Sequence, residues 1–534
     1  MARCPTLVVA GTHSGSGKTS ISLALTRALA RRGFAVQTFK TGPDFLDPSY
    51  LALASGRPCH NLDSWMAGKD HIAGLFADAT ADADCAIVEG VMGLFDGAAA
   101  ENSEGSTAEI ARLLSAPILL IVNVHGMGRS VAALVKGFVT FESDLPFTGV
   151  VANHAGSERH AAWISDALKA AGLPPLVGAI PRGAFPTLES RHLGLVTADG
   201  KLLSEATLDR LADALEGRIS IAALFPELPA VAPVKEPADA CEGRIDRNAN
   251  GSLDSRFPGN DQPKADMATL DMFAYRRDNA AETSSPRQES LFPELFAGDA
   301  AVPAASPGTA KPGRSVAQEQ PRIGVARDEA FHFYYQALFD ALTAVGGEVC
   351  FFSPLRDERL PEGLSGLYLG GGYPEIYAEG LAANEKMRAA IRDFAASGRP
   401  LYAECGGLIY LSQGLQERDD RFHPFLGLLP ARARMRDAKK ALGYVEVTLR
   451  EDSLWGKCGE TFRGHEFHYS ELIEDPAVDP SWRRIYDLRR RRSETIEREG
   501  FQKGNLLASY THLYYAAHPA AVAHFLKGCK GDPL

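Results

Sequence analysis

The stretch Leu7-Val-Val-Ala-Gly-Thr-His-Ser-Gly-Ser-Gly-Lys-Thr19 determines how the first half of the chain folds. Residues Leu7–Ala10 form an apolar, β-branched run that is typical of a buried strand, and Ser20–Ala30 has the spacing of an amphipathic helix. The glycine-rich residues Gly11–Thr19 lie between them. Glycine lets successive backbone N–H groups curl around an anion, and the helix N-terminus adds partial positive charge. The order strand, loop, helix therefore predicts a phosphate-binding loop.

Each residue type in this loop suits a nucleoside triphosphate. Lys18 is placed to reach the terminal phosphates, and the Thr19 hydroxyl is placed to bind Mg²⁺. The spacing is a variant, because Thr12 stands where the usual pattern has its first glycine, which here is Gly11. We therefore predict ATP and Mg²⁺ as cofactors. The residues expected to bind the nucleotide are Gly11, Thr12, Ser14, Gly15, Ser16, Gly17, Lys18 and Thr19.

Two carboxylates follow neighbouring apolar runs. Asp44 comes after the run Ala35–Phe39, and Glu89 comes directly after the run Cys85–Val88. Ligands of open α/β sheets bind at the carboxyl ends of strands, and Mg²⁺ takes one or two carboxylates together with phosphate oxygens and water. We expect Asp44 and Glu89 to join Thr19 at the metal. Either acid taken alone could instead be a solvated loop residue or a helix cap.

The chain divides into two patterned regions and a third between them. Apolar strands alternate with helical stretches from Thr6 to about Phe225, which predicts a parallel sheet covered on both faces. The alternation resumes at Arg322, with a helix expected at Phe331–Val345. We assign residues 1–226 to an ATP-binding domain and 322–534 to a second α/β domain. Residues 227–321 are rich in Pro, Ala, Asp and Ser without a sustained period, and we expect a disordered linker there.

Composition narrows the class of protein. A length of 534 residues is too great for one hydrophobic core and predicts two or three domains. Eight cysteines occur without a C-x-x-C pair, which indicates reduced thiols and a cytoplasmic location. No apolar run of about 18 residues predicts a membrane span, and no signal peptide is recognisable. The net charge of −11 argues against nucleic-acid binding and favours small-molecule partners.

A cysteine in the second domain has the setting of a nucleophile. In Pro400-Leu-Tyr-Ala-Glu-Cys-Gly-Gly407, Cys405 lies between a short strand and a helix, and the following glycines allow a tight turn. A helix N-terminus lowers the pKa of a thiol and favours the reactive thiolate. Cys85 and Cys350 have the apolar surroundings of structural cysteines, whereas Cys405 does not. We predict that Cys405 is catalytic.

The residues that would assist this cysteine are distant in sequence. His512, just past a short strand, is the best candidate for the general base. Gly371 and Gly372 follow another strand and offer backbone N–H groups for an oxyanion hole. His465 and His468 lack the four-residue spacing of a zinc helix, so a role at the active-site interface is favoured over metal binding. The arginine run at residues 489–492 is interpreted as solvated surface, with contact to an anionic substrate as the alternative.

These motifs, taken together and in this order, resemble a known family. The phosphate loop is similar to the dethiobiotin-synthetase-like branch of phosphate-loop proteins. The whole set resembles the cobyrinate and hydrogenobyrinate a,c-diamide synthase family of cobalamin biosynthesis. The segments that carry this second resemblance are 11–19, 40–48, 88–97, 191–195, 370–375, 404–407 and 464–468. The linker is longer than the connection usual in that family.

The resemblance implies a fold and a reaction. The expected fold is an N-terminal phosphate-loop NTPase domain with a dethiobiotin-synthetase-like parallel sheet, followed by a C-terminal class I glutamine amidotransferase-like α/β domain. ATP would phosphorylate the c and then the a acetate carboxylate of a polycarboxylate corrinoid, and ammonia released from glutamine at Cys405 would displace the phosphate. Glutamine and the corrinoid are the expected partners, and a homodimer is considered for the assembly.

The resemblance also suggests roles for further residues. The carboxylates Asp44, Asp47, Glu89 and Asp96 would orient substrate or intermediate, as would His465 and His468. The usual third member of such a glutaminase is a glutamate in a His-x-Glu pattern, but His512 is followed by Leu513 and Tyr514. A catalytic pair of cysteine and histidine is therefore expected.

Two other classes of phosphate-loop protein fit the sequence less well. A partition-type ATPase carries a second lysine where this loop has His13, and a dethiobiotin-type ligase would end near residue 230. The second α/β domain argues against both. The sister amidotransferases are cobyric acid synthase, which usually has a different loop, and the enzyme that amidates nickel sirohydrochlorin. The nickel-tetrapyrrole enzyme shares nearly every motif, so the sequence leaves it open.

Overall fold

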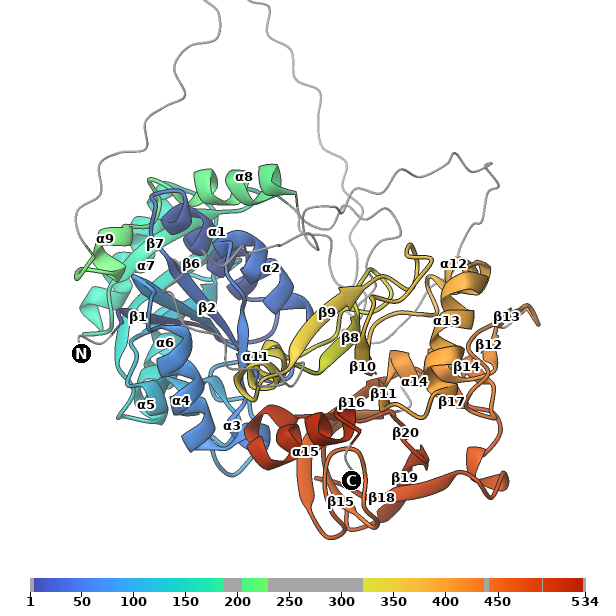
Figure 1. Cartoon of the computed structure of the whole chain (residues 1–534). Helices are drawn as coiled ribbons and strands as arrows, with labels where there is room; N and C mark the ends of the chain where they lie inside the picture. The colour runs from blue at the N-terminus through green and yellow to red at the C-terminus, as the bar shows by residue number, and fades with distance from the viewer. Residues whose placement is uncertain are drawn as a thin grey trace, which may run out of the picture.

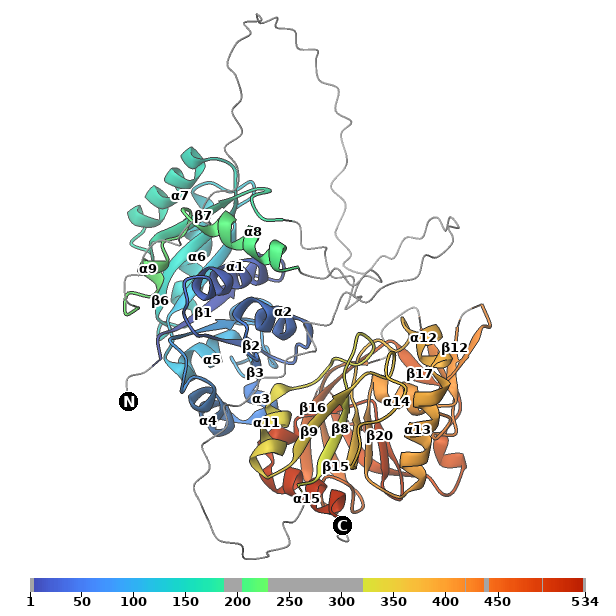
Figure 2. The same ribbon diagram turned by 45° about the horizontal axis from the view of Figure 1, so that its top comes forward.

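Two α/β halves lie side by side in the computed structural model of the chain (Figures 1 and 2). The structure describes residues 4–186, 204–228, 320–417, 419–436, 441–491 and 493–531. The predicted linker at 227–321 lies almost entirely outside these residues, as does the motif at 191–195. None of the helices in the described ranges combines the length and apolarity needed to cross a lipid bilayer.

The first half is built on a seven-stranded sheet whose paired strands are all parallel. Its central strands are buried along almost their whole length, which explains why they appear in the sequence as continuous apolar runs. In sheet order the strands are β3 (His60–Leu62), β2 (Val36–Thr41), β4 (Cys85–Glu89), β1 (Thr6–Gly11), β5 (Ile118–Asn123), β6 (Phe147–Ala155) and β7 (Leu176–Pro181).

Helices cover both faces of this sheet (Figure 1). They are α1 (Lys18–Ala30), α2 (Leu46–Ser55), α3 (Ser64–Ala67), α4 (Lys69–Ala79), α5 (Thr107–Leu114), α6 (Ser130–Phe141), α7 (Glu158–Ala170), α8 (Glu205–Leu215) and α9 (Ile221–Leu224). Strand β1 lies between β4 and β5, so the loop after β1 opens beside the ends of β4 and β2. This order brings the glycine-rich loop next to the predicted acidic residues.

The second half contains a ten-stranded mixed sheet. Strands β9, β8, β10, β11 and β20 are parallel, and the remaining pairings are antiparallel. In sheet order the strands are β21 (His512–Leu513), β16 (Thr461–His468), β15 (Ala441–Leu449), β18 (Arg483–Arg490), β19 (Ile496–Lys503), β20 (Leu506–Ser509), β11 (Leu401–Glu404), β10 (Leu364–Leu369), β8 (Arg322–Ala326) and β9 (Glu348–Phe352).

Helices and a small sheet complete this half. The helices are α11 (Gln336–Ala344), α12 (Ala378–Ala383), α13 (Glu385–Ala396), α14 (Gly406–Leu411) and α15 (Pro519–Cys529), with 3₁₀ turns η1 (Pro476–Val478) and η2 (Tyr515–Ala517). A four-stranded sheet is formed by β13 (Phe422–Pro424), β12 (Gly414–Gln416), β14 (Ala433–Met435) and β17 (Ser470–Leu472). The chain folds back at β21, which pairs with β16 and places His512 opposite His465.

One predicted element begins in the wrong place. A helix was expected at Phe331–Val345, but helix α11 begins only at Gln336. The preceding residues are extended, and the backbone N–H groups of His332 and Phe333 both donate to the carbonyl of Gly371. Burial alternates along this segment, with Phe331, Phe333 and Tyr335 inside. Burial in this aromatic run therefore repeats every two residues, as in an extended segment, and does not have the period of a helix.

Polar side chains and rings join the two halves. The Tyr444 hydroxyl donates to Asp63 at 2.7 Å, and His60 contacts Asp340 at 2.7 Å. Helix α11 packs against strand β3, and helix α3 packs against strand β16. The indole of Trp65 packs against the Tyr444 ring at an interplanar angle of 37°, with their ring centroids 4.7 Å apart. The halves therefore meet along the edge of the first sheet that contains β3.

Candidate active site

The glycine-rich loop has the backbone that a phosphate site requires. Gly15 and Gly17 have φ angles of 83° and 103°, a region that residues with a Cβ rarely adopt. Helix α1 begins at Lys18, directly after this loop. The Asn153 side chain donates to the carbonyl of Ser16 at 2.9 Å and braces the loop from the end of β6. The sequence argument missed Asn153, although a polar residue ending a buried strand was a usable signal.

Lys18 and Thr19 lie where the sequence places them. The Lys18 ammonium folds back and donates to the backbone carbonyls of His13 and Met92. The Thr19 hydroxyl donates to Glu89 Oε1 at 2.6 Å. Glu89 is the last residue of β4 and is fully buried. Thr19 and Glu89 thus lie together at the end of β4, while their binding of a metal stays a prediction.

A second lysine at this edge was not assigned a role from the sequence. Lys40, on β2, donates to Glu89 Oε1 at 2.9 Å and lies 2.7 Å from Asp47 Oδ2. All three side chains are almost completely buried. Buried charges persist when each is paired and hydrogen-bonded, and here one cation holds two carboxylates. The network fixes the positions of two of the predicted acidic residues.

The residues present fit a Mg²⁺ ion. The second carboxylate oxygen of Glu89 is buried, and none of the described residues hydrogen-bonds to it. Together with the Thr19 hydroxyl it provides hard oxygen ligands of the kind Mg²⁺ prefers. Within the described ranges no group of three or more His, Cys, Asp or Glu side chains could hold a metal, so phosphate oxygens and water would complete the coordination.

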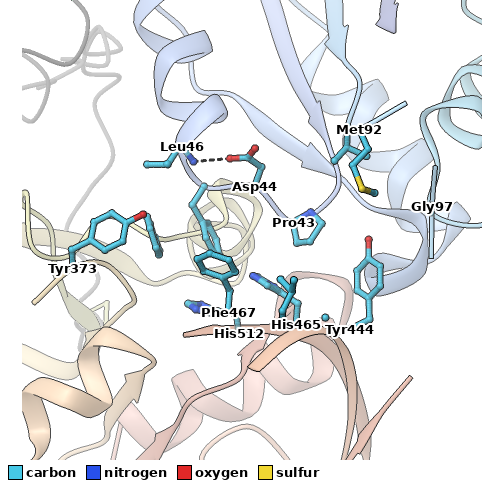
Figure 3. Close-up of a pocket in the computed structure, with 16 residues that line it drawn as sticks. Pro43, Asp44, Leu46, Met92, Gly97, Tyr373, Tyr444, His465, Phe467 and His512 are labelled. Atoms are coloured by element: carbon cyan, nitrogen blue, oxygen red, sulfur yellow. Dashed lines mark hydrogen bonds between the residues drawn. The ribbon is translucent and has the colours of Figure 1, made fainter. Parts of the chain in front are cut away.

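The other two predicted carboxylates hold loops in shape. Asp44 Oδ1 accepts the N–H groups of Leu46 and Asp47 at 2.9 and 3.1 Å, so this oxygen acts as a cap for helix α2 (Figure 3). Asp96 is exposed and accepts the N–H of Gly93 at 2.8 Å. Asp44 also lines the cavity between the halves. The alternative interpretation of Asp44 as a helix cap is therefore correct for one of its oxygens.

The predicted elbow in the second half has the backbone strain of a nucleophile turn. Cys405 follows β11 directly and has φ 50° and ψ −101°, a rare combination for a residue with a side chain. Helix α14 begins at Gly406. A Cβ on Gly407 would lie 2.0 Å from the carbonyl oxygen of Leu369, so only glycine fits there. This geometry presents the thiol at the end of the sheet.

His512 lies beside Cys405, and a third polar group joins them. The Cys405 sulfur contacts the Phe467 carbonyl oxygen at 3.9 Å, and its charge raises the pKa of His512. Glu404 Oε1 lies 2.6 Å from His512 Nδ1, and both side chains are buried. The sequence predicted a pair of Cys405 and His512 alone, but the Glu404 carboxylate also contacts the imidazole. Burial lowers the pKa of His512, but Cys405 and Glu404 outweigh that effect and raise it to about 10.

The glycines predicted for the oxyanion hole lie against this elbow. A Cβ on Gly406 would come within 2.9 Å of the Gly372 nitrogen, and one on Gly371 would meet the His512 ring at 2.5 Å. Side chains at these positions would therefore fill the space around the thiol. The Gly372 N–H is close enough to the elbow to serve an oxyanion formed at Cys405.

The two histidines of β16 have different surroundings. The His465 ring stacks on His512 with centroids 4.9 Å apart, and its Nδ1 lies 3.0 Å from the Tyr335 hydroxyl. Burial and the neighbouring His512 lower the pKa of His465 well below its ordinary value, so this ring is neutral. His468 stacks on Tyr510 and contacts the Ser470 carbonyl. Only His465 lines the cavity between the halves.

A cavity of about 440 Å³ lies between the two halves and is lined by residues of both (Figure 3). Phe45, from the loop before α2, crosses into the second half, where its ring centroid lies 5.0 Å from that of Phe333 and 5.0 Å from that of His512. The walls are mainly apolar. The lining residues are Pro43, Asp44, Phe45, Leu46, Val91, Met92, Gly97 and Gly105 from the first half, and Phe333, Tyr373, Leu442, Gly443, Tyr444, His465, Phe467 and His512 from the second.

The arginine run is engaged with carboxylates of the protein itself. Arg489 pairs with Glu446, and Arg490 pairs with Glu466 and Glu497. Arg491 reaches across to Glu104 of the first half, and its guanidinium lies over the Trp65 ring. These contacts favour the interpretation of the run as surface and interface over that of a substrate site. Residue 492 lies outside the described ranges.

Comparisons with known protein families match each half separately. Residues 7–196 match the CobQ/CobB/MinD/ParA nucleotide binding domain, and residues 322–520 match the CobB/CobQ-like glutamine amidotransferase domain. A nucleotide-binding half joined to a glutaminase half defines a glutamine-hydrolysing ligase.

Whole-chain relatives narrow this class to one family. The chain is 47% identical over 529 residues to the cobyrinate a,c-diamide synthase of Syntrophotalea carbinolica, with 99% of each chain covered. It is 36% identical to the enzyme of the same name from Leptospira interrogans strain Fiocruz L1-130, again with 99% of each covered. The hydrogenobyrinate a,c-diamide synthase of Streptomyces coelicolor is 37% identical, with 98% of each covered. The chain belongs to the family of cobyrinate and hydrogenobyrinate a,c-diamide synthases.

The two family models leave residues 197–321 between them unmatched, and the unusual length of the linker stays a prediction.

Proposed function

We propose that this enzyme converts the a and c acetate carboxylates of cobyrinate or hydrogenobyrinate into amides, using ATP and glutamine. The observation that supports this most directly is the cavity between the halves. One wall carries Asp44 and Met92, whose carbonyl accepts from Lys18 of the phosphate loop, and the other carries His512 of the glutaminase. Two chemistries that must exchange a small molecule thus border the same cavity.

The first half prepares the carboxylate. When bound, ATP with Mg²⁺ supplies the phosphoryl group that turns a poor acyl donor into an acyl phosphate. Lys18 and the loop N–H groups stabilise the phosphate charge, and Thr19 and Glu89 are the residues that would hold the metal. Lys40 pairs with Asp47 and Glu89 and fixes both side chains beside this site. Asp44 and Asp96 support the two loops at its rim.

The second half releases ammonia from glutamine. The Cys405 thiolate attacks the side-chain amide carbon and forms a C–S bond, and the Gly372 N–H stabilises the oxyanion. The C–N bond then breaks as His512 gives its proton to the departing nitrogen, which leaves as ammonia. Water next attacks the thioester while His512 takes a proton from it, and glutamate leaves. The balance is glutamine plus water to glutamate plus ammonia.

The cavity between the sites suits the transfer of neutral ammonia. Its walls include Phe45, Leu46, Phe333 and Phe467, and an apolar environment disfavours protonation to ammonium. Ammonia attacks the carbonyl carbon of the acyl phosphate, a C–N bond forms, and the C–O bond to phosphate breaks. Loss of one proton gives the amide. Because ATP and glutamine are metabolites of the cytoplasm, we place the reaction there.

Product analysis tests this function. Purified enzyme is incubated with ATP, Mg²⁺ and glutamine, and with cobyrinate, hydrogenobyrinate or nickel sirohydrochlorin in separate reactions. Mass spectrometry should show two successive carboxylate-to-amide conversions on one of the first two tetrapyrroles and none when ATP is omitted. The time course of the singly amidated product gives the order of amidation. Amidation of nickel sirohydrochlorin alone would contradict the proposal.

A further inference from the structure

The carboxylate nearest the predicted general base comes from the residue just before the nucleophile. Glu404 is the last residue of β11, and its Oε1 lies 2.6 Å from His512 Nδ1. A carboxylate accepts hydrogen bonds and does not donate them when ionised, so Nδ1 must carry the proton of this contact. That leaves Nε2 for Cys405. The contact therefore selects the tautomer that a general base for the thiol needs.

Glu404 is itself held on its other side. The Tyr402 hydroxyl donates to Glu404 Oε2 at 2.9 Å, so both carboxylate oxygens have partners. Glu404 also pairs in register with Ser509 of the parallel strand β20, three residues before His512. Glu404 thus ends β11, and His512 begins β21, which pairs with β16. The pairing of β11 with β20 and of β21 with β16 holds the two side chains in contact.

The position that would ordinarily carry the acid cannot do so here. Tyr514 stands two residues after His512, and its buried hydroxyl has no hydrogen-bond partner among the described residues. Glu499 is another carboxylate beside β20, and it accepts from Ser509 and the Tyr510 N–H. Glu404 is therefore the carboxylate that contacts the imidazole.

We propose that Glu404 is the positioning residue of the glutaminase, the third member of a Cys405–His512–Glu404 triad whose acid is supplied by the strand of the nucleophile. This inference rests on the proposed roles of Cys405 and His512 in glutamine hydrolysis. Glu404 orients the ring and stabilises its protonated form, while the thiol and the imidazole carry out the bond changes.

The pH profile separates this role from a merely structural one. The active pair is a thiolate beside an imidazolium, and it is lost when His512 deprotonates at high pH. Glu404 and Cys405 raise the pKa of His512 to about 10 against the opposing effect of burial. Removing the negative charge in Glu404→Gln lowers this pKa. The alkaline limb of kcat/KM for glutamine hydrolysis must then move to lower pH.

The experiment compares three variants in the full-length enzyme. Glu404→Gln should lower kcat for glutamine hydrolysis about 100-fold or more, with little change in KM, and should shift the alkaline limb. Tyr402→Phe keeps the carboxylate but removes the donor that partly neutralises its charge, so it should shift the limb by less and in the opposite direction, to higher pH. Glu499→Gln is the matched control, because the same change is made in a half-buried glutamate whose partners are Ser509 and Tyr510.

Amidation with ammonium salts in place of glutamine reports on folding and on the nucleotide half, and it should be unchanged in all three variants. An unshifted alkaline limb in both Glu404→Gln and Tyr402→Phe would overturn the inference. If Glu404→Gln fails to fold, the shift in Tyr402→Phe decides. Failure of the proposed function is distinguishable, because the parent enzyme would then release no glutamate from glutamine at any pH.

Discussion

Lys40 carries its charge in a place almost closed to water. Its ammonium is paired with Asp47 and Glu89, and all three side chains are at most 4% exposed. The cost of burying a charge is several kcal/mol per ion unless partners compensate it. Lys40 is therefore the residue whose loss leaves the largest uncompensated charge at the nucleotide edge.

The substitution Lys40→Met should reduce the free energy of unfolding by about 3–5 kcal/mol, because two buried carboxylates lose their common partner. Urea denaturation of the ligand-free protein measures this. Lys69→Met is the matched control, since the Lys69 side chain is 64% exposed and its pairing with Glu109 contributes little. Equal effects of the two substitutions would show that the buried network does not stabilise the fold.

Replacing Cys405 separates the two chemistries. Cys405→Ser should reduce glutamine-dependent amidation by more than about 10³-fold, because the hydroxyl is a far weaker nucleophile than the thiolate, while amidation with ammonium salts persists. Lys18→Met should remove both. Product formation is followed by mass spectrometry, with Cys85→Ser as the control. Loss of ammonia-dependent turnover in Cys405→Ser would argue against the assignment.

For single residues, the sequence predicted a role only where the residues that reveal it are close neighbours along the chain. Lys18, Thr19 and Cys405 have their diagnostic neighbours within a few residues, so a local motif identifies them. Lys40 meets Glu89 across 49 positions, and Glu404 meets His512 across 108. No local pattern marks such pairs, because strand order brings them together. Glu404 belongs to the local motif around Cys405, but that motif does not predict its contact with His512.

Among the elements, the turn from β11 to α14 is the most tightly constrained. Helix α14 starts directly after the strained Cys405, and Gly407 packs against the backbone of β10. Close packing of this kind leaves no volume for a methyl group. The elbow is thus rigid because backbone meets backbone.

Gly407→Ala should destabilise the protein by about 1–3 kcal/mol and lower glutaminase activity, since its Cβ would lie 2.0 Å from the Leu369 carbonyl oxygen. Gly137→Ala on helix α6 is the control. A Cβ at Gly137 meets nothing within 4 Å, and alanine favours a helix by about 0.5–1 kcal/mol. Thermal unfolding of both variants checks the contrast, and a neutral Gly407→Ala would contradict the packing argument.

Element positions were predicted best where one physical cause acts alone. The strands β1, β4 and β5 are buried on both faces, so their apolar runs mark them to within one or two residues. The start of α11 was missed because the aromatic residues before it are held extended by the carbonyl of Gly371. That partner lies in another strand's loop and leaves no trace in the local sequence.

At the scale of the whole molecule, Phe45 links the two halves. It belongs to the loop between β2 and α2, next to Asp44 and close to Asp47, and its ring packs against Phe333, Tyr335, His465 and His512. The motifs around Asp44 and Cys405 do not predict that this ring lies at the glutaminase, because neither motif contains information on how the two halves dock. One short loop thus touches both active sites.

Phe45→Ala should lower the ratio of amide formed to glutamate released several-fold, because water enters the space left by the ring and ammonia escapes or becomes protonated. Glutamate and amide are measured in the same reaction. Phe141→Ala, at a side chain that is 72% exposed on α6, is the control. An unchanged ratio in Phe45→Ala would show that the ring does not help to retain ammonia.

The position of Glu404 next to Cys405 also affects how such a glutaminase can be inherited. Neighbouring codons encode the acid and the nucleophile, because Glu404 ends β11 and Cys405 follows it directly. Recombination or grafting therefore moves the two residues together. His512 is the partner that a recipient sheet must supply, just beyond the end of the strand that is parallel to that of the nucleophile. In a glutaminase with the His-x-Glu pattern, transfer of the elbow moves the nucleophile without its acid.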